Sequence, residues 1–371
     1  MTLSQQPLTG PSDIIAALPG IFGFYPQEST VIVGLLSDGF TFANGKTSAV
    51  LGPVMRADIA HTHHMLPALL HTPGGQCEAY YAVIVTRIPD SELVSRTTEL
   101  LSSLRSPQGG PLIDACWHVS EIAHGTPYTL VFGPNEEQRQ ASGLGKDWAG
   151  GTVSSVASSP AMEQLLSNGG LPELGREEAF AFFDPFDPEP EGHPDYDPPA
   201  ARALGNQLAA AYRDGEFGVW EDFAERCAII HEAMARPVIT ECEADASVFA
   251  CPGDGVELAA MLSRRCGRDA LIVDALASPL SAATALAWVA KAYSGEIRAN
   301  ALSLWAIIAT ERKLSSWAII ALTCAQLEEP GHSLSEMLLT MLHNGMHDEL
   351  VETAAAGCAM TWEAIDPATA T

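Results

Sequence analysis

Strand-like and helix-like patterns occupy different parts of this chain. Short apolar runs rich in β-branched residues end by residue 132, whereas after Pro199 the hydrophobic residues recur only with helical spacing. Local runs of this kind are the main sequence signal for secondary structure. The order therefore predicts an α/β domain followed by an all-helical domain. The expected strands cover residues 30–36, 52–59, 78–86, 112–119 and 128–132.

One βαβ unit is expected within the first domain. Asp90 or Ser91 can cap a helix after the run at 78–86, and Pro107 to Gly110 end that helix before the run at 112–119. A strand, a helix and a strand in this order imply parallel pairing. The run at 30–36 is almost wholly apolar, which is typical of a strand covered on both faces. We therefore predict a largely parallel sheet.

The segment 184–199 separates the two predicted domains. Six of its sixteen residues are acidic and six are proline. Such a composition is typical of a stiff, solvated linker. The expected organisation of the 371 residues is an α/β domain at 1–183, a linker at 184–199, a helical domain at 200–358 and a disordered tail at 359–371.

The helical domain contains one pair of helices with a tetratricopeptide-like rhythm. Trp305, Ala318, Leu322, Ala325 and Pro330 fall at positions that fit one helix–turn–helix repeat. An ordinary packed helical hairpin explains the same small residues, because small side chains are common where helices cross. Neighbouring windows match poorly, so we expect a single pair. Ser333-x-x-Glu336 has the pattern of a capping box that opens the following helix.

The first sixty residues concentrate polar groups beside two predicted strands. Ser12 or Asp13 is expected to cap a short helix, which Pro19 and Gly20 would end.

The candidate site follows this helix. Arg56 and Asp58 share one face of a strand, because side chains alternate along it, and Glu28 and Ser29 precede the neighbouring strand. Ligands of open α/β sheets bind at strand ends, so these four side chains form a candidate polar site. The alternative is an arginine–carboxylate pair that only fastens the loop to the strand.

Two further clusters are secondary candidates. His61 and His63 lie close to Asp58 and could supply mixed nitrogen and oxygen ligands to a metal. Histidines at a helix start are usually just exposed, and we expect no metal site. Arg268 and Asp269 follow Gly267 at the expected start of a helix, where Asp269 would suit the helix dipole. The pair could instead fasten the two domains together, and we favour a structural role.

Charge and motif content exclude several classes of function. The formal net charge of −27 repels phosphate backbones, so we expect no nucleic-acid partner. No G-x-G-x-x-G, G-x-S-x-G or H-E-x-x-H motif is present, and no cofactor is expected. Eight scattered cysteines without a C-x-x-C pair indicate free thiols in a reducing compartment. With no signal peptide or membrane span in the sequence, we expect a cytoplasmic protein without membrane contact.

The polar residues of the opening segment also carry a family resemblance. The pattern Pro11-x-Asp13, Leu18-Pro19, Gly23-Phe24-x-Pro26-x-x-Ser29 and Arg56-x-Asp58 resembles the actinobacterial domain-of-unknown-function family DUF4192. Weaker matches follow at 175–178, 184–185, 268–271 and 318–334. The resemblance implies no activity, cofactor or catalytic residue.

Two functions remain after these exclusions. The first is a non-enzymatic interaction or regulatory protein that binds a protein partner through its helical domain. The second is a small-molecule-binding or hydrolytic α/β enzyme with its site at Glu28, Ser29, Arg56 and Asp58. Convergence of these four side chains in an open pocket would favour the enzyme, whereas mutual pairing would favour the first function.

Overall fold

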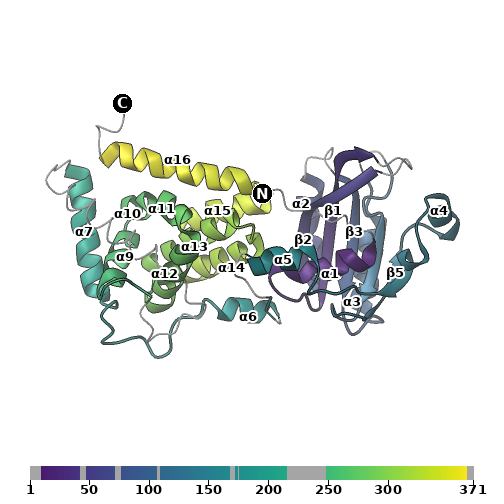
Figure 1. Cartoon of the computed structure of the whole chain (residues 1–371), viewed down its shortest axis with the longest axis horizontal. Coiled ribbons are helices and arrows are strands. Elements are labelled where there is room, and N and C mark those ends of the chain that lie inside the picture. The colour runs from purple at the N-terminus through teal and green to yellow at the C-terminus, as the bar shows by residue number, and fades with distance from the viewer. Residues whose placement is uncertain are drawn as a thin grey trace. The chain divides into compact units, whose positions relative to one another are not determined.

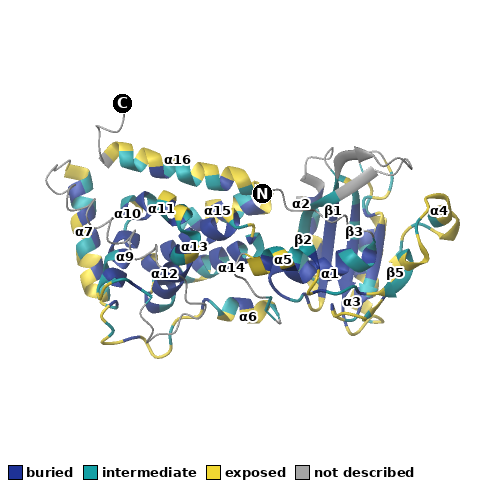
Figure 2. Ribbon diagram, viewed as in Figure 1, coloured by how far each residue is buried: buried dark blue, intermediate teal, exposed yellow. Residues whose placement is uncertain are grey.

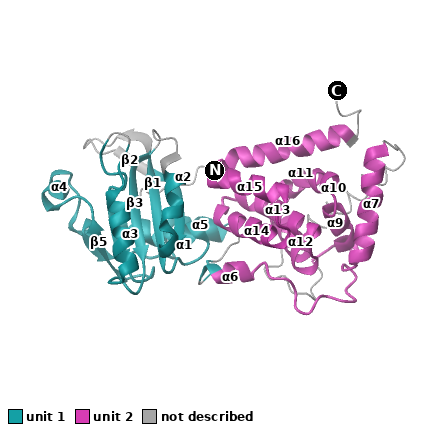
Figure 3. Ribbon diagram, turned by 180° about the vertical axis from the view of Figure 1, so that it is seen from behind, with its two compact units in different colours: residues 1–176 teal, residues 177–371 magenta. Residues whose placement is uncertain are grey.

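The computed structural model shows two compact units, formed by residues 1–176 and 177–371 (Figures 1 and 3). It describes residues 10–41, 47–71, 77–106, 109–167, 172–173, 175–214 and 248–365. The first unit contains a six-stranded sheet with helices, and the described part of the second unit is helical. The expected succession of an α/β part and a helical part is therefore confirmed.

The sheet is mostly antiparallel, so the prediction of a largely parallel sheet is wrong. Its strand order is β2-β1-β3-β4-β5-β6. Among the described strands only β3 and β4 pair in parallel, and α3 (Glu92–Ser103) connects them as the predicted βαβ unit. The connection between β4 and β5 is too short for a crossover, and these two strands pair antiparallel. The strands are β1 (Ser29–Thr41), β2 (Thr47–Asp58), β3 (Cys77–Val85), β4 (Ala115–Val119), β5 (Pro127–Phe132) and β6 (Gly150–Thr152).

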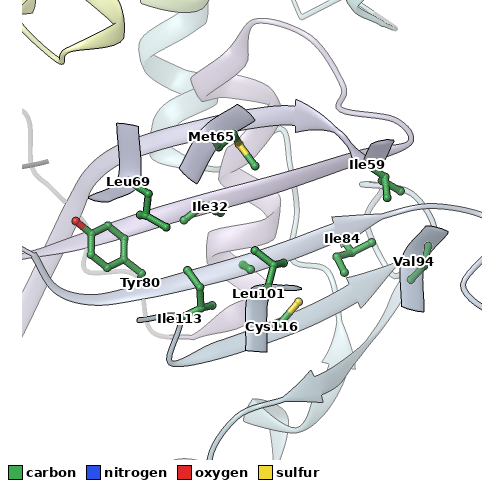
Figure 4. Close-up of a cluster of buried hydrophobic side chains, with 11 residues drawn as sticks. Ile32, Ile59, Met65, Leu69, Tyr80, Ile84, Val94, Leu101, Ile113 and Cys116 are labelled. Carbon is green, nitrogen blue, oxygen red and sulfur yellow. The ribbon is translucent and has the colours of Figure 1, made fainter. Parts of the chain in front are cut away.

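A hydrophobic core fills one face of this sheet (Figure 4). Ile32 and Ile84 from the central strands meet Leu101 from α3 and Met65 from the helical turn η1 (Ile59–Met65). The predicted cap of α3 is confirmed, because Ser91 Oγ accepts a hydrogen bond from Val94 N at 3.2 Å. The remaining short helices of the unit are α2 (Leu66–His71), α4 (Glu136–Ala141), η2 (Lys146–Trp148) and α5 (Pro160–Ser167).

The first helix, α1 (Pro11–Phe22), differs from its prediction at both ends. Gly10 precedes the helix without a side-chain cap, and Ser12 Oγ donates instead to Thr152 O at 2.7 Å. The helix continues through Pro19 and Gly20, where an end was expected. Packing explains the continuation: a Cβ on Gly20 would lie 2.4 Å from the backbone of Ala161 in α5. The close approach of α5 stabilises a helix that local propensity alone would end.

Buried helices α12 and α13 lie at the centre of the second unit (Figure 2). Every residue of α13 from Ile297 to Thr310 is buried, and α13 packs against α14 as the predicted helical pair. The predicted helix at 219–234 lies outside the described residues. The helices are α6 (Arg176–Ala181), α7 (Pro198–Asp214), α9 (Asp254–Leu262), α10 (Arg265–Ala270), α11 (Ile272–Ala277), α12 (Pro279–Ala292), α13 (Glu296–Glu311), α14 (Ser315–Glu328), α15 (Ser333–His343) and α16 (His347–Ile365).

The acidic segment 184–199 lies within the second unit and is packed against its helices. Asp195 has no exposed surface, and its Oδ1 accepts from Gly253 N at 2.8 Å and from Gly255 N at 3.0 Å. Tyr293 OH donates to Asp195 O at 2.7 Å. A charged segment can thus be ordered when its carboxylate satisfies the free N–H groups at a helix start.

Two helix ends in the second unit also differ from expectation. His332 is the N-cap of α15, because its side chain accepts from Ser335 N, so the expected Ser333–Glu336 capping box does not open this helix. The helix α16 extends to Ile365, so residues 359–365 of the expected disordered tail are helical.

Candidate functional site

Arg56 is the centre of the polar cluster at the end of β1 and β2. Its Nε donates to Ser29 Oγ at 2.9 Å, and its Nη2 lies 2.6 Å from Asp58 Oδ1. Nη2 also donates weakly to Gln27 O at 3.4 Å. The guanidinium carbon lies 6.0 Å from the centre of the Phe24 ring, within the range of a cation–π contact. The structure therefore brings three of the four predicted residues together.

Strand register explains why these three side chains meet. Ser29 lies opposite Asp58 across the β1–β2 pair, and Val31 lies opposite Arg56. Directly opposed residues share a face of the sheet, and so do residues two apart along a strand. Ser29, Arg56 and Asp58 therefore lie on one face, where the long Arg56 side chain spans the distance to both partners.

Glu28 turns towards a different neighbour. Its backbone φ is 42°, a left-handed conformation that is unusual for a residue with a Cβ. Its Oε2 accepts from Thr86 Oγ1 at 2.8 Å and its Oε1 from Arg87 N at 3.2 Å. No hydrogen bond or ion pair joins Glu28 to Arg56 among the described residues. Glu28 thus ties the start of β1 to the end of β3.

The contacts of the cluster leave no activated nucleophile. Ser29 is fully buried, and its Oγ donates to Gln27 O at 2.5 Å while accepting from Arg56. A nucleophilic serine needs a general base as its hydrogen-bond acceptor, and a backbone carbonyl cannot take the proton. Burial lowers the pKa of Arg56 and outweighs the opposing effect of Asp58. The arrangement stabilises the positions of the loop and the two strands.

The histidine candidates do not form a metal centre. His61 Nδ1 lies 3.7 Å from Asp58 Oδ2, and His63 packs edge-on against His64 with ring centres 4.1 Å apart. Both predicted ligands lie in η1, which is a helical turn. Across the residues with described placement, no group of three histidine, cysteine or acidic side chains could hold a metal.

Arg268 and Asp269 lie in the last turn of α10, and not at a helix start as expected. Arg268 Nε donates to Asp269 Oδ1 at 2.7 Å, and Nη1 donates to Asn300 Oδ1 at 3.0 Å. Arg268 is buried, so its charge needs these acceptors. All of these partners belong to the second unit, where the pair joins α10 to α13.

The sequence reasoning missed a cavity of about 480 Å³ in the second unit. Three arginines line it, which is a concentration of cations in a chain with only 19 basic residues. The adjacent pair Arg264-Arg265 was a visible signal, but Arg213 lies far from it in the sequence. We call this feature the arginine cavity; its lining residues are Ala209, Tyr212, Arg213, Arg264, Arg265, Cys266, Asp269, Glu296 and Thr361.

The fold and these sites define a two-unit protein that joins a mixed α/β sheet unit to a helical unit. The family model described as Domain of unknown function (DUF4192) matches residues 11–349. The chain therefore belongs to this family, as its opening motif indicated. No curated protein and no solved structure matches it. In the part of the chain that is described, no helix combines the length and apolarity needed to cross a bilayer.

Proposed function

We propose that this protein is a non-enzymatic, cytoplasmic regulatory protein that acts by binding through its helical unit. The observation that carries this proposal is the mutual pairing of the sheet-end cluster. Arg56 engages Ser29 and Asp58, while Glu28 engages Thr86. Polar groups that satisfy one another in this way stabilise a fold, whereas catalytic groups are held ready for a substrate.

The thiols support a reducing compartment. None of the described cysteines is in a disulfide, and Cys116 and Cys358 are buried. Free buried cysteines behave as small apolar side chains and are typical of proteins that remain in the cytoplasm.

The helical unit has two candidate binding features, the arginine cavity and a surface for a protein partner. Leu327 on α14 and Met360 on α16 are 73% and 70% exposed, which is unusual for large apolar side chains. Single exposed apolar residues are common on monomeric proteins, however. The arginine cavity is the more specific feature, because it combines a concave shape with a particular charge.

Variants at the sheet end test the proposal against the enzyme alternative. Wild-type protein and Asp58→Asn would be purified from the native cytosol, and bound metabolites and proteins would be identified by mass spectrometry. We expect wild type and Asp58→Asn to carry the same bound molecules. Glu92→Gln is the control, because Glu92 is an exposed carboxylate of the same unit. Loss of one bound metabolite from Asp58→Asn, with no change in Tm, would support the enzyme instead.

A further inference from the structure

The arginine cavity lies where three helices of the second unit meet. Figure 1 shows α7, α10 and the C-terminal end of α16 beside one another, and α10 packs against both of the others. Specific contacts hold this arrangement. Arg264 Nε donates to Asn206 Oδ1 of α7 at 3.1 Å, and Trp362 Nε1 of α16 donates to Ala270 O of α10 at 3.0 Å. The cavity is thus formed by well-anchored elements.

Close packing sets the position of α7. A Cβ on Gly205 would lie 2.7 Å from Ala260 O of α9, so glycine is needed for this approach. Residues four, seven and eight positions further along a helix lie near the same face. Ala209, Tyr212 and Arg213 occupy these positions and line the cavity.

The charges of the lining do not cancel within the protein. Asp269 accepts from the buried Arg268, and Glu296 Oε2 lies 3.6 Å from Arg264 Nη1. No ion pair involves Arg213 or Arg265 among the described residues; Arg213 Nε only donates to Ala209 O at 3.3 Å. Within the described part of the chain, two arginines therefore border the cavity without an ion-pair partner, in a protein that carries a large negative net charge.

We propose that the arginine cavity binds a small phosphorylated metabolite. Two cations without a counterion match a phosphate dianion better than a monoanionic carboxylate, and guanidinium groups bind phosphate oxygens in a bidentate manner. Tyr212 and Ala209 provide less polar surface for the rest of the ligand. A cavity of about 480 Å³ is within the size range of small-molecule sites. This inference rests on the proposed function and names the class of ligand.

Calorimetric titration of the full-length protein tests the proposal. The probes are inorganic phosphate, pyrophosphate and AMP, with adenosine as the uncharged counterpart of AMP and acetate as a carboxylate. We expect the phosphate probes to bind with an affinity that falls as salt concentration rises, and adenosine and acetate not to bind. Failure of all three phosphate probes to bind, or equal binding of acetate, would overturn the proposal.

Substitutions locate the binding. Arg265→Ala and Arg213→Ala should each weaken phosphate binding about tenfold or more, since each removes one charge-assisted contact. Arg265→Lys should bind with intermediate affinity, because lysine keeps the positive charge but cannot make the bidentate contact of a guanidinium group. Arg105→Ala is the matched control, since Arg105 is an exposed arginine of the first unit. Binding that is equal in Arg105→Ala and Arg265→Ala, with circular dichroism showing both folded, would rule out this cavity.

The same experiment separates this inference from the proposed function. Phosphate probes that fail to bind, while another metabolite co-purifies with the protein, would reject the ligand class and leave the binding function standing. A bound phosphate ester that is hydrolysed, as detected by phosphorus NMR, would reject the non-enzymatic function and leave the cavity as the site.

Discussion

Arg56 and Asp58, two residues apart on one strand, form an ion pair in which only one partner is well buried. The Arg56 side chain is 11% exposed and that of Asp58 is 47% exposed, with 2.6 Å between Nη2 and Oδ1. The pair is therefore less shielded from water than a fully buried one. Arg56 therefore stabilises the first unit mainly through the hydrogen bonds that it donates to groups inside the fold.

Removal of Arg56 should destabilise the first unit. Arg56→Ala leaves the buried Ser29 hydroxyl without its donor, and a hydrogen bond to a charged group contributes about 1.5–3 kcal/mol. Urea unfolding should show a loss of that size. Arg96→Ala is the control, because Arg96 forms an exposed i,i+4 pair whose loss costs about 0.5 kcal/mol or less. Equal losses in both variants would contradict the role of Arg56 in stabilising the loop and the two strands.

Gly20→Ala should destabilise the packing of α1 on α5. The new Cβ would lie 2.4 Å from backbone atoms of Ala161 and Met162, which no rotamer change can relieve. Overpacking of this kind costs about 1–3 kcal/mol, more than alanine gains through its helix propensity. Gly10→Ala is the control, since no atom lies within 4 Å of its added Cβ. A Tm for Gly20→Ala at or above that of wild type would contradict the predicted clash.

The stability of the second unit should decrease in mild acid through His332. Burial, together with Arg268 and Arg265, lowers the pKa of His332 from 6.5 to about 4. Its neutral ring donates through Nε2 to Asn300 Oδ1 at 2.9 Å and accepts at Nδ1 from Ser335 N at 3.3 Å. Between these pKa values the unfolded chain binds a proton that the folded protein does not. The contribution of the neutral His332 ring to the free energy of unfolding is therefore complete above pH 6.5 and is lost as the pH falls towards about 4.

Chemical unfolding across this pH range measures the effect. The free energy of unfolding of wild type should fall with decreasing pH more steeply than that of His332→Asn, in which asparagine can still cap α15. His343→Asn, at an exposed histidine of the same helix, should keep the wild-type slope. A slope that is unchanged in His332→Asn would show that another group titrates.

Asp195→Ala should expose the acidic segment 184–199 to proteases. The substitution leaves two N–H groups at the start of α9 without an acceptor and should cost about 1.5–3 kcal/mol. Glutamyl endopeptidase should then cut after Glu191, and mass spectrometry would identify the fragments. Wild type and Asp214→Ala, which alters an exposed aspartate of α7, should resist cleavage there. Rapid cleavage of wild type after Glu191 would support a solvated linker.

Local patterns identified most elements of the first unit but not their partners. The run at 30–36 and the cap at Ser91 were predicted correctly because each depends on neighbouring residues. The antiparallel pairing of β1 between β2 and β3 was not, since a strand that is buried on both faces has a continuous apolar run whichever way its neighbours point. The meeting of Ser29, Arg56 and Asp58 was anticipated because alternation and strand ends limit where such side chains can lie.

The sequence by itself determined where most strands and helices form and that an α/β part precedes a helical part. It did so because alternation, helical periodicity and capping are local properties of the chain. Only the tertiary structure decided the antiparallel sheet, the continuation of α1 through Pro19, the ordering of Asp195 and the convergence of Arg213 with Arg265. These features depend on contacts between residues far apart in the chain, and no local pattern contains their free energies.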